Sequence, residues 1–98
     1  MRAPPKPRVC VLVLERPVPR DDLPTVAERV RALVAESGAE VVLCDARGLP
    51  ADMRSVDALV RALVVARRLG RAFHTRRVSP ELAALIAFCG LDALLGPG

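Results

Sequence analysis

The chain has 98 residues, enough for one domain near the lower end of the common size range. Its hydrophobic fraction of 52% and charged fraction of 27% are typical of a globular protein and exclude an intrinsically disordered chain. No apolar run approaches the roughly 20 residues of a membrane-spanning helix. The longest strand-like run, Val9 to Leu14, is also too short for the hydrophobic region of a secretion signal. We therefore predict a cytoplasmic protein with no inserted membrane segment.

The net charge of +4 comes almost wholly from arginine, because Lys6 is the only lysine. A basic domain raises the question of nucleic-acid binding. Aromatic residues, however, make up 2% of the chain, with no Trp or Tyr to stack on bases. The arginines are also scattered, and the densest stretch, residues 67–77, is explained by a solvated helix end and the strand after it. We predict no nucleic-acid partner.

Few residues suggest catalysis or metal binding. The three cysteines, Cys10, Cys44 and Cys89, lack the paired spacing of a zinc site, and we predict buried reduced thiols. The single histidine, His74, has no motif around it, and no glycine-rich phosphate loop is present. The sequence therefore favours a protein that is not an enzyme and holds no cofactor or metal.

The first half of the chain alternates between a strand and a helix. A proline-rich lead-in, Met1 to Arg8, precedes the apolar run Val9 to Leu14, which predicts a strand covered on both faces. Asp21 or Asp22 then offers an N-cap for a helix, with Pro24 in its first turn. Gly38 is the expected end of that helix.

The second half repeats this alternation. Glu40 to Asp45 predicts a second buried strand, and Ala46 to Arg54 a loop. A helix is expected over Ser55 to Leu69, with its inner face formed by Val56, Leu59, Val60, Leu63 and Ala66. Arg71 to Val78 predicts a short strand near an edge of the sheet. Ser79-Pro80-Glu81 is typical of a helix start, Gly90 ends that helix, and Leu91 to Leu95 adds one more turn or strand.

This order predicts an α/β fold of the form βαβαβα in a single domain over residues 9–98. Strands separated by helices of this length pair in parallel through right-handed crossovers. The sheet then has three strands, or four if Leu91 to Leu95 forms another.

In such a sheet, ligands and partners bind at the carboxyl ends of the strands. The loops expected there are Glu15 to Asp22, Asp45 to Ser55 and Arg76 to Ser79. The middle loop has the densest set of polar residues and leads into a helix N-terminus, whose free N–H groups favour an anion. Asp45 and Asp52 are candidates for an acid and base pair, but carboxylates in such loops more often accept bonds from backbone N–H groups.

From Val41 onward the sequence resembles the STAS domain, a family named for sulphate transporters and anti-sigma-factor antagonists. The resemblance lies in the stretches Val41-Val42-Leu43-Cys44-Asp45-Ala46-Arg47-Gly48-Leu49, Val56-Asp57-Ala58-Leu59, Ala66-Arg67-Arg68-Leu69-Gly70, Ser79-Pro80-Glu81-Leu82 and Phe88-Cys89-Gly90-Leu91. It covers about the last sixty residues, and the part before Gly38 fits more loosely.

The sequence departs from the family at the phosphorylation site. Antagonists of this family are regulated by phosphorylation of the serine after a loop aspartate. If Asp52 matches that aspartate, Met53 occupies the acceptor position, and a thioether cannot accept phosphate. In an ungapped match Arg54 occupies it. Ser55 is a substitute acceptor at most, and its more common role is that of a helix N-cap.

The resemblance implies a protein-binding regulator of transcription that acts without the usual serine phosphorylation. Its partner would be an anti-sigma factor or a related serine kinase, bound through Asp45, Arg47, Asp52, Met53, Arg54, Ser55, Asp57 and Arg61. Two alternatives stay open. One is an accessory subunit of a lipid ABC transporter, and the other is a sensor of a nucleotide or another small molecule.

Overall fold

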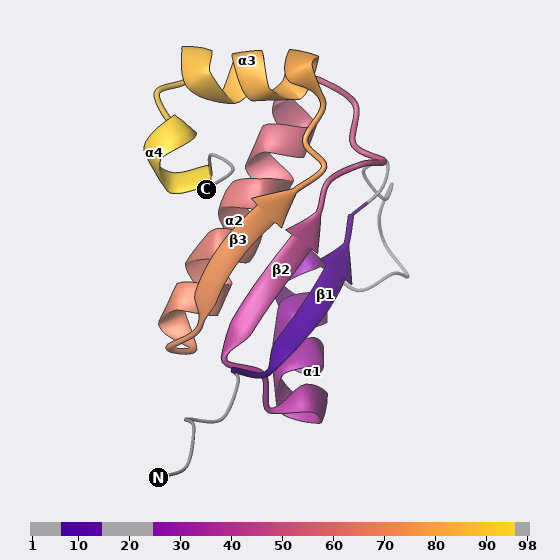
Figure 1. The fold of residues 1–98 in the computed structure, drawn as a ribbon, viewed down its shortest axis with the longest axis vertical. Coiled ribbons are helices and arrows are strands. Elements are labelled where there is room, and N and C mark those ends of the chain that lie inside the picture. Colours follow the sequence, from indigo (N-terminus) through magenta and orange to yellow (C-terminus); the bar gives the residue numbers. More distant parts are fainter. Residues whose placement is uncertain (1–6, 15–24, 96–98) are drawn as a thin grey trace, which may run out of the picture.

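The computed structural model describes residues 7–14 and 25–95 of the chain. Within these residues a three-stranded parallel sheet, in the order β1-β2-β3, is packed against helices (Figure 1). The elements are β1 (Val9–Val13), α1 (Val26–Ser37), β2 (Val41–Asp45), α2 (Met53–Arg68), β3 (Ala72–Arg76), α3 (Pro80–Phe88) and α4 (Asp92–Leu95). The predicted α/β class with alternating strands and helices is confirmed. The segment Leu91 to Leu95 forms the short helix α4 and not a further strand.

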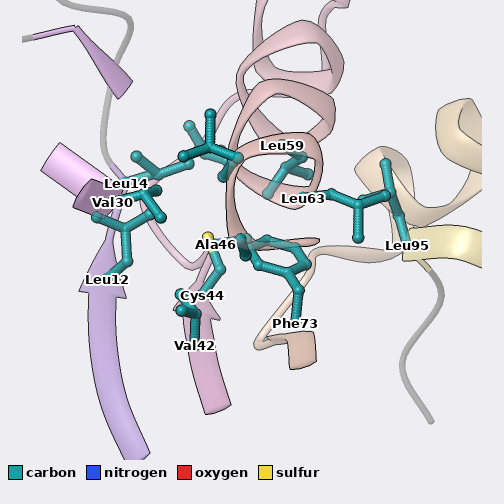
Figure 2. Packing of buried hydrophobic residues seen from close by; sticks show 14 of the residues in the cluster. Leu12, Leu14, Val30, Val42, Cys44, Ala46, Leu59, Leu63, Phe73 and Leu95 are labelled. Atoms are coloured by element: carbon teal, nitrogen blue, oxygen red, sulfur yellow. The ribbon is translucent and has the colours of Figure 1, made fainter. Parts of the chain in front are cut away.

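Helices α1 and α2 lie on the same face of the sheet (Figure 1). Each strand pairs with the next one along the chain, and both crossovers are right-handed, so both helices return across the same face. The core fills the space between the sheet and these helices (Figure 2). Leu12 and Val42 enter it from the sheet, and Val30 and Leu59 enter it from the helices.

The opposite face of the sheet is not covered by any described element. The side chains of β1 alternate between exposed and buried, and Val9, Val11 and Val13 keep 51%, 41% and 47% of their surface exposed. The prediction that this strand is covered on both faces is therefore wrong. Its apolar run suggested double coverage, but the sequential strand order places none of the described helices on the second face. The prediction of a short third strand at an edge is confirmed by β3.

Local capping sets the helix ends. Helix α1 begins at Val26, because the Thr25 hydroxyl accepts a hydrogen bond from the N–H of Glu28 at 3.2 Å. The predicted cap residues Asp21 and Asp22, the predicted loop Glu15 to Asp22 and most of the lead-in lie outside the described residues. Gly38 ends the helix as predicted, with a left-handed φ of 63°.

Helices α3 and α4 follow β3 and are the last two elements of the described chain. Ser79 caps α3 by accepting from the N–H of Leu82 at 3.1 Å, and Pro80 occupies its first turn, both as predicted. Helix α4 is tied to the edge strand, because the Thr75 hydroxyl donates to the carbonyl of Leu95 at 2.7 Å. On α2, four of the five residues predicted to face inward are buried, and Val60 is half-buried.

Among the helices that the structure describes, none has the length and apolar character needed to cross a bilayer.

The three thiols are expected to differ sharply in reactivity. Cys10 and Cys44 are buried, and burial, reinforced by the neighbouring Asp45 carboxylate, raises the pKa of Cys44 to about 12. Cys89 is half-buried at the end of α3. In the native protein Ellman's reagent should therefore react first with Cys89, and Cys89→Ser should remove this fast phase. Fast labelling that persists in Cys89→Ser would contradict the burial of the other two thiols.

Candidate docking surface

The predicted site residues lie where β2 passes into α2, at the carboxyl end of the sheet (Figure 1). The connecting loop is held by its own backbone. The N–H of Leu49 donates to the carbonyl of Ala46, and the N–H of Asp52 donates to that of Pro50, both at 3.0 Å. Leu49 is also buried and anchors the loop in the core. The loop is therefore well fixed where it presents the start of α2.

Asp45 is the buried member of the predicted set. One carboxylate oxygen accepts from the N–H of Arg47 at 3.0 Å, and the other lies 4.0 Å from both Arg76 and Arg77. The backbone N–H of Arg47 is the main cause that lowers the pKa of Asp45, helped by the arginine charges. Asp45 therefore connects the loop between β2 and α2 to the end of β3.

Asp52, and not Ser55, is the N-cap of α2. The Asp52 carboxylate accepts a hydrogen bond from the N–H of Ser55 at 2.9 Å, and this bond is the main cause that lowers the pKa of Asp52. The predicted capping role of Ser55 is thus wrong, because the helix begins two residues earlier, at Met53. The expectation that the strand-end carboxylate of Asp45 accepts a bond from a loop N–H group is confirmed.

Ser55 is fully buried in the first turn of α2. Its side chain is 0% exposed, and its hydroxyl lies close enough to the Asp52 carboxylate to help lower that group's pKa but makes no hydrogen bond of full geometry among the described residues. A kinase needs an exposed hydroxyl, so phosphorylation of Ser55 requires the first turn of α2 to open. The other predicted residues, Arg47, Asp52, Met53, Arg54, Asp57 and Arg61, are exposed.

The exposed residues of α2 form a ridge along the helix. Met53, Asp57 and Arg61 follow one another at intervals of four residues and therefore share one face. The predicted pair of Asp57 and Arg61 is confirmed, with Nε of Arg61 donating to the carboxylate at 2.7 Å. Arg54 lies beside this ridge in the first turn.

Sequence reasoning missed the most exposed apolar residue at this end of the molecule. Phe88, the last residue of α3, is 88% exposed, and Met53 is 56% exposed. The two helices meet here, because the sulfur atoms of Cys89 and Met53 lie 3.8 Å apart. The sequence did contain a signal for this exposure, because Phe88 is a large apolar residue that lies outside the predicted buried stripe Leu82, Leu85, Ile86 and Cys89. We call Met53, Arg54, Asp57, Arg61 and Phe88 the docking patch.

No family model, curated protein or solved structure matches this chain. Among the residues that the structure describes, no three His, Cys, Asp or Glu side chains are grouped so that they could hold a metal ion. The similarity of residues 41–91 to STAS domains thus remains a resemblance of sequence motifs.

Substitution of Ser55 tests its burial. Ser55→Ala removes an unsatisfied buried hydroxyl and should raise the melting temperature by up to about 5 °C. Ser55→Glu, which imitates phosphoserine, should lower it by about 10 °C or more, because a carboxylate must be buried or the first turn opened. Ser79→Ala is the matched control and should be destabilising, because Ser79 does cap a helix. A destabilised Ser55→Ala would contradict this account.

The lowered pKa values of Asp45 and Asp52 predict an acid dependence of stability. Because each carboxylate is favoured in its ionised form by the folded backbone, its contribution is complete above the ordinary aspartate pKa. The contribution is lost as the pH falls through the lowered folded pKa. The midpoint of urea unfolding should therefore fall on acidification. Asp45→Asn and Asp52→Asn should each lower the midpoint at neutral pH and flatten this fall, whereas an unchanged slope in both variants would contradict the assignment.

Proposed function

We propose that this chain is a STAS-like protein-binding module, an anti-sigma-factor antagonist type of regulator of transcription. It acts by sequestering an anti-sigma factor or a related serine kinase. The observation that carries the proposal is the docking patch, in which exposed Met53 shares a face of α2 with charged side chains and contacts Cys89, the residue that follows the exposed Phe88.

The patch has the composition of a protein-binding surface. Binding energy at interfaces is concentrated in a few anchors, often aromatic, that become desolvated, while charged residues at the rim set which partner is accepted. Burying an exposed phenylalanine side chain contributes roughly 2–3 kcal/mol. Phe88 is the candidate anchor, and Arg54 with the pair Asp57–Arg61 forms the rim.

The same region supports binding without a phosphorylation switch. Met53, or Arg54 in an ungapped match, stands where the family has its acceptor serine, and neither side chain has a hydroxyl that could take phosphate. Ser55, the substitute acceptor, is fully buried. Control of binding therefore rests on the amounts of the competing proteins and not on modification of this helix.

Calorimetric titration with a purified anti-sigma factor of the serine-kinase class tests the proposal. Phe88→Ala should weaken binding at least about tenfold, because the anchor is lost. It should leave the melting temperature unchanged, because the side chain is exposed in the free protein. Leu69→Ala is the matched control: Leu69 is also an exposed apolar residue, 37% exposed, but it lies at the far end of α2, about two turns beyond Arg61. Arg54→Glu combined with Asp57→Arg should abolish binding of the anti-sigma factor, because the two changes reverse the charges at the rim of the docking patch.

Three results would count against the proposal. Equal affinities of wild type, Phe88→Ala and the charge-reversed double variant would show that the docking patch is not the interface. Stable co-purification with an ATPase subunit, and no binding to the kinase, would favour the transporter role. A thermal shift with one nucleotide of a panel, in the absence of any protein partner, would favour the sensor role.

A further inference from the structure

The two edges of the sheet differ in chemistry. The β3 edge carries His74 and Arg76, is followed by Arg77 at a left-handed φ of 58°, and is tied to α4 through Thr75. Charged side chains and covering elements are the usual protection of an edge against pairing with another strand. Strand β1 has the sequence Val-Cys-Val-Leu-Val and contains no charge, proline or glycine. Among the residues that the structure describes, the β1 edge therefore lacks the protection that the β3 edge has.

The backbone of β1 offers a pairing surface at this edge. The carbonyl of Arg8 and the N–H of Leu14 bond to the β2 side, so the intervening even-numbered residues also face β2. The N–H and carbonyl groups of Val9, Val11 and Val13 consequently point away from β2. The carbonyl of Val13 accepts from the Arg29 guanidinium at 2.7 Å, which fixes Arg29 at the carboxyl end of this edge.

A groove of about 380 Å³ runs along the same edge, between β1 and α1. Its helical wall consists of Arg29, Ala32, Leu33 and Glu36. Positions at intervals of three, four and seven lie on one stripe of a helix. The stripe therefore has an apolar centre, with a positive charge at one end and a negative charge at the other.

We propose that a second copy of this chain occupies the β1 edge. The two β1 strands pair antiparallel about a two-fold axis at Val11, and the α1 stripes pack antiparallel behind them. The two three-stranded sheets then form one sheet of six strands.

The charges of the stripe are complementary under this symmetry. Helix α1 runs antiparallel to β1, and Arg29 lies beside Val13. Seven residues of helix span about 10 Å, as do three residues of strand, so Glu36 lies near the start of β1. The two-fold axis places Val13 opposite the first residue of the other β1, and Arg29 therefore faces Glu36 of the second copy. When a second copy of the stripe is placed against it in the opposite direction, positive charge meets negative charge at both ends and the apolar centres meet each other. Such self-complementarity is what an isologous dimer requires.

Variants with reversed charges at Arg29 and Glu36, measured separately and as a mixture, test the proposed dimer. This test does not involve the docking patch. By analytical ultracentrifugation the wild type should be a dimer. Glu36→Arg and Arg29→Glu should each weaken self-association at least about tenfold, because each creates two like-charge pairs. An equimolar mixture of the two variants should restore dimers, because the heterodimer contains two opposite-charge pairs. Glu81→Arg on α3, with the same change of charge as Glu36→Arg, should remain dimeric.

The strand pairing has its own test. Val11→Lys should give a folded monomer, because two ammonium groups would meet at the two-fold axis. His74→Lys, on the same face of the sheet but on β3, is the matched control and should stay dimeric. A wild type that is monomeric at high concentration, or Glu36→Arg and Arg29→Glu variants whose mixture gives no dimer, would overturn the proposal.

Discussion

The fold depends on one topological constraint, the sequential pairing of three parallel strands through right-handed crossovers. This order sends α1 and α2 to the same face, where they bury Leu12, Val42 and their neighbours. The second face and the β1 edge are left without a helix of the described chain. The most apolar strand of the protein is thus half exposed because of topology and not because of its own composition.

The sequence predicted the elements because their signals are local. Gly38 ends α1 through a left-handed conformation, and Ser79-Pro80-Glu81 starts α3 as its cap pattern indicates. The coverage of β1 was not predictable in the same way. A continuous apolar run is compatible with one or two covered faces, and the choice depends on where distant helices pack.

The site shows the same division between local and distant information. Asp45 and Asp52 accept hydrogen bonds from residues two and three positions later, and such short-range bonds are expected of aspartates in turns. The burial of Ser55 depends on the choice of Asp52 as the cap, which shifts the serine from the helix terminus into its first turn. The spacing within α3 places Phe88 off the buried stripe, but the contact between Cys89 and Met53 depends on how α3 crosses the end of α2, and no spacing within α3 specifies that crossing.

The parallel pairing also has a consequence for synthesis on the ribosome. Val9 pairs with Val41, so the first strand has to wait for a partner 32 residues later in the chain. At the usual elongation rates of about 5–20 residues per second, this delay lasts roughly 2–6 s. During that time the nascent chain presents an unpaired valine-rich segment. During this interval the first strand is a segment of the nascent chain that is open to aggregation or to binding by a chaperone.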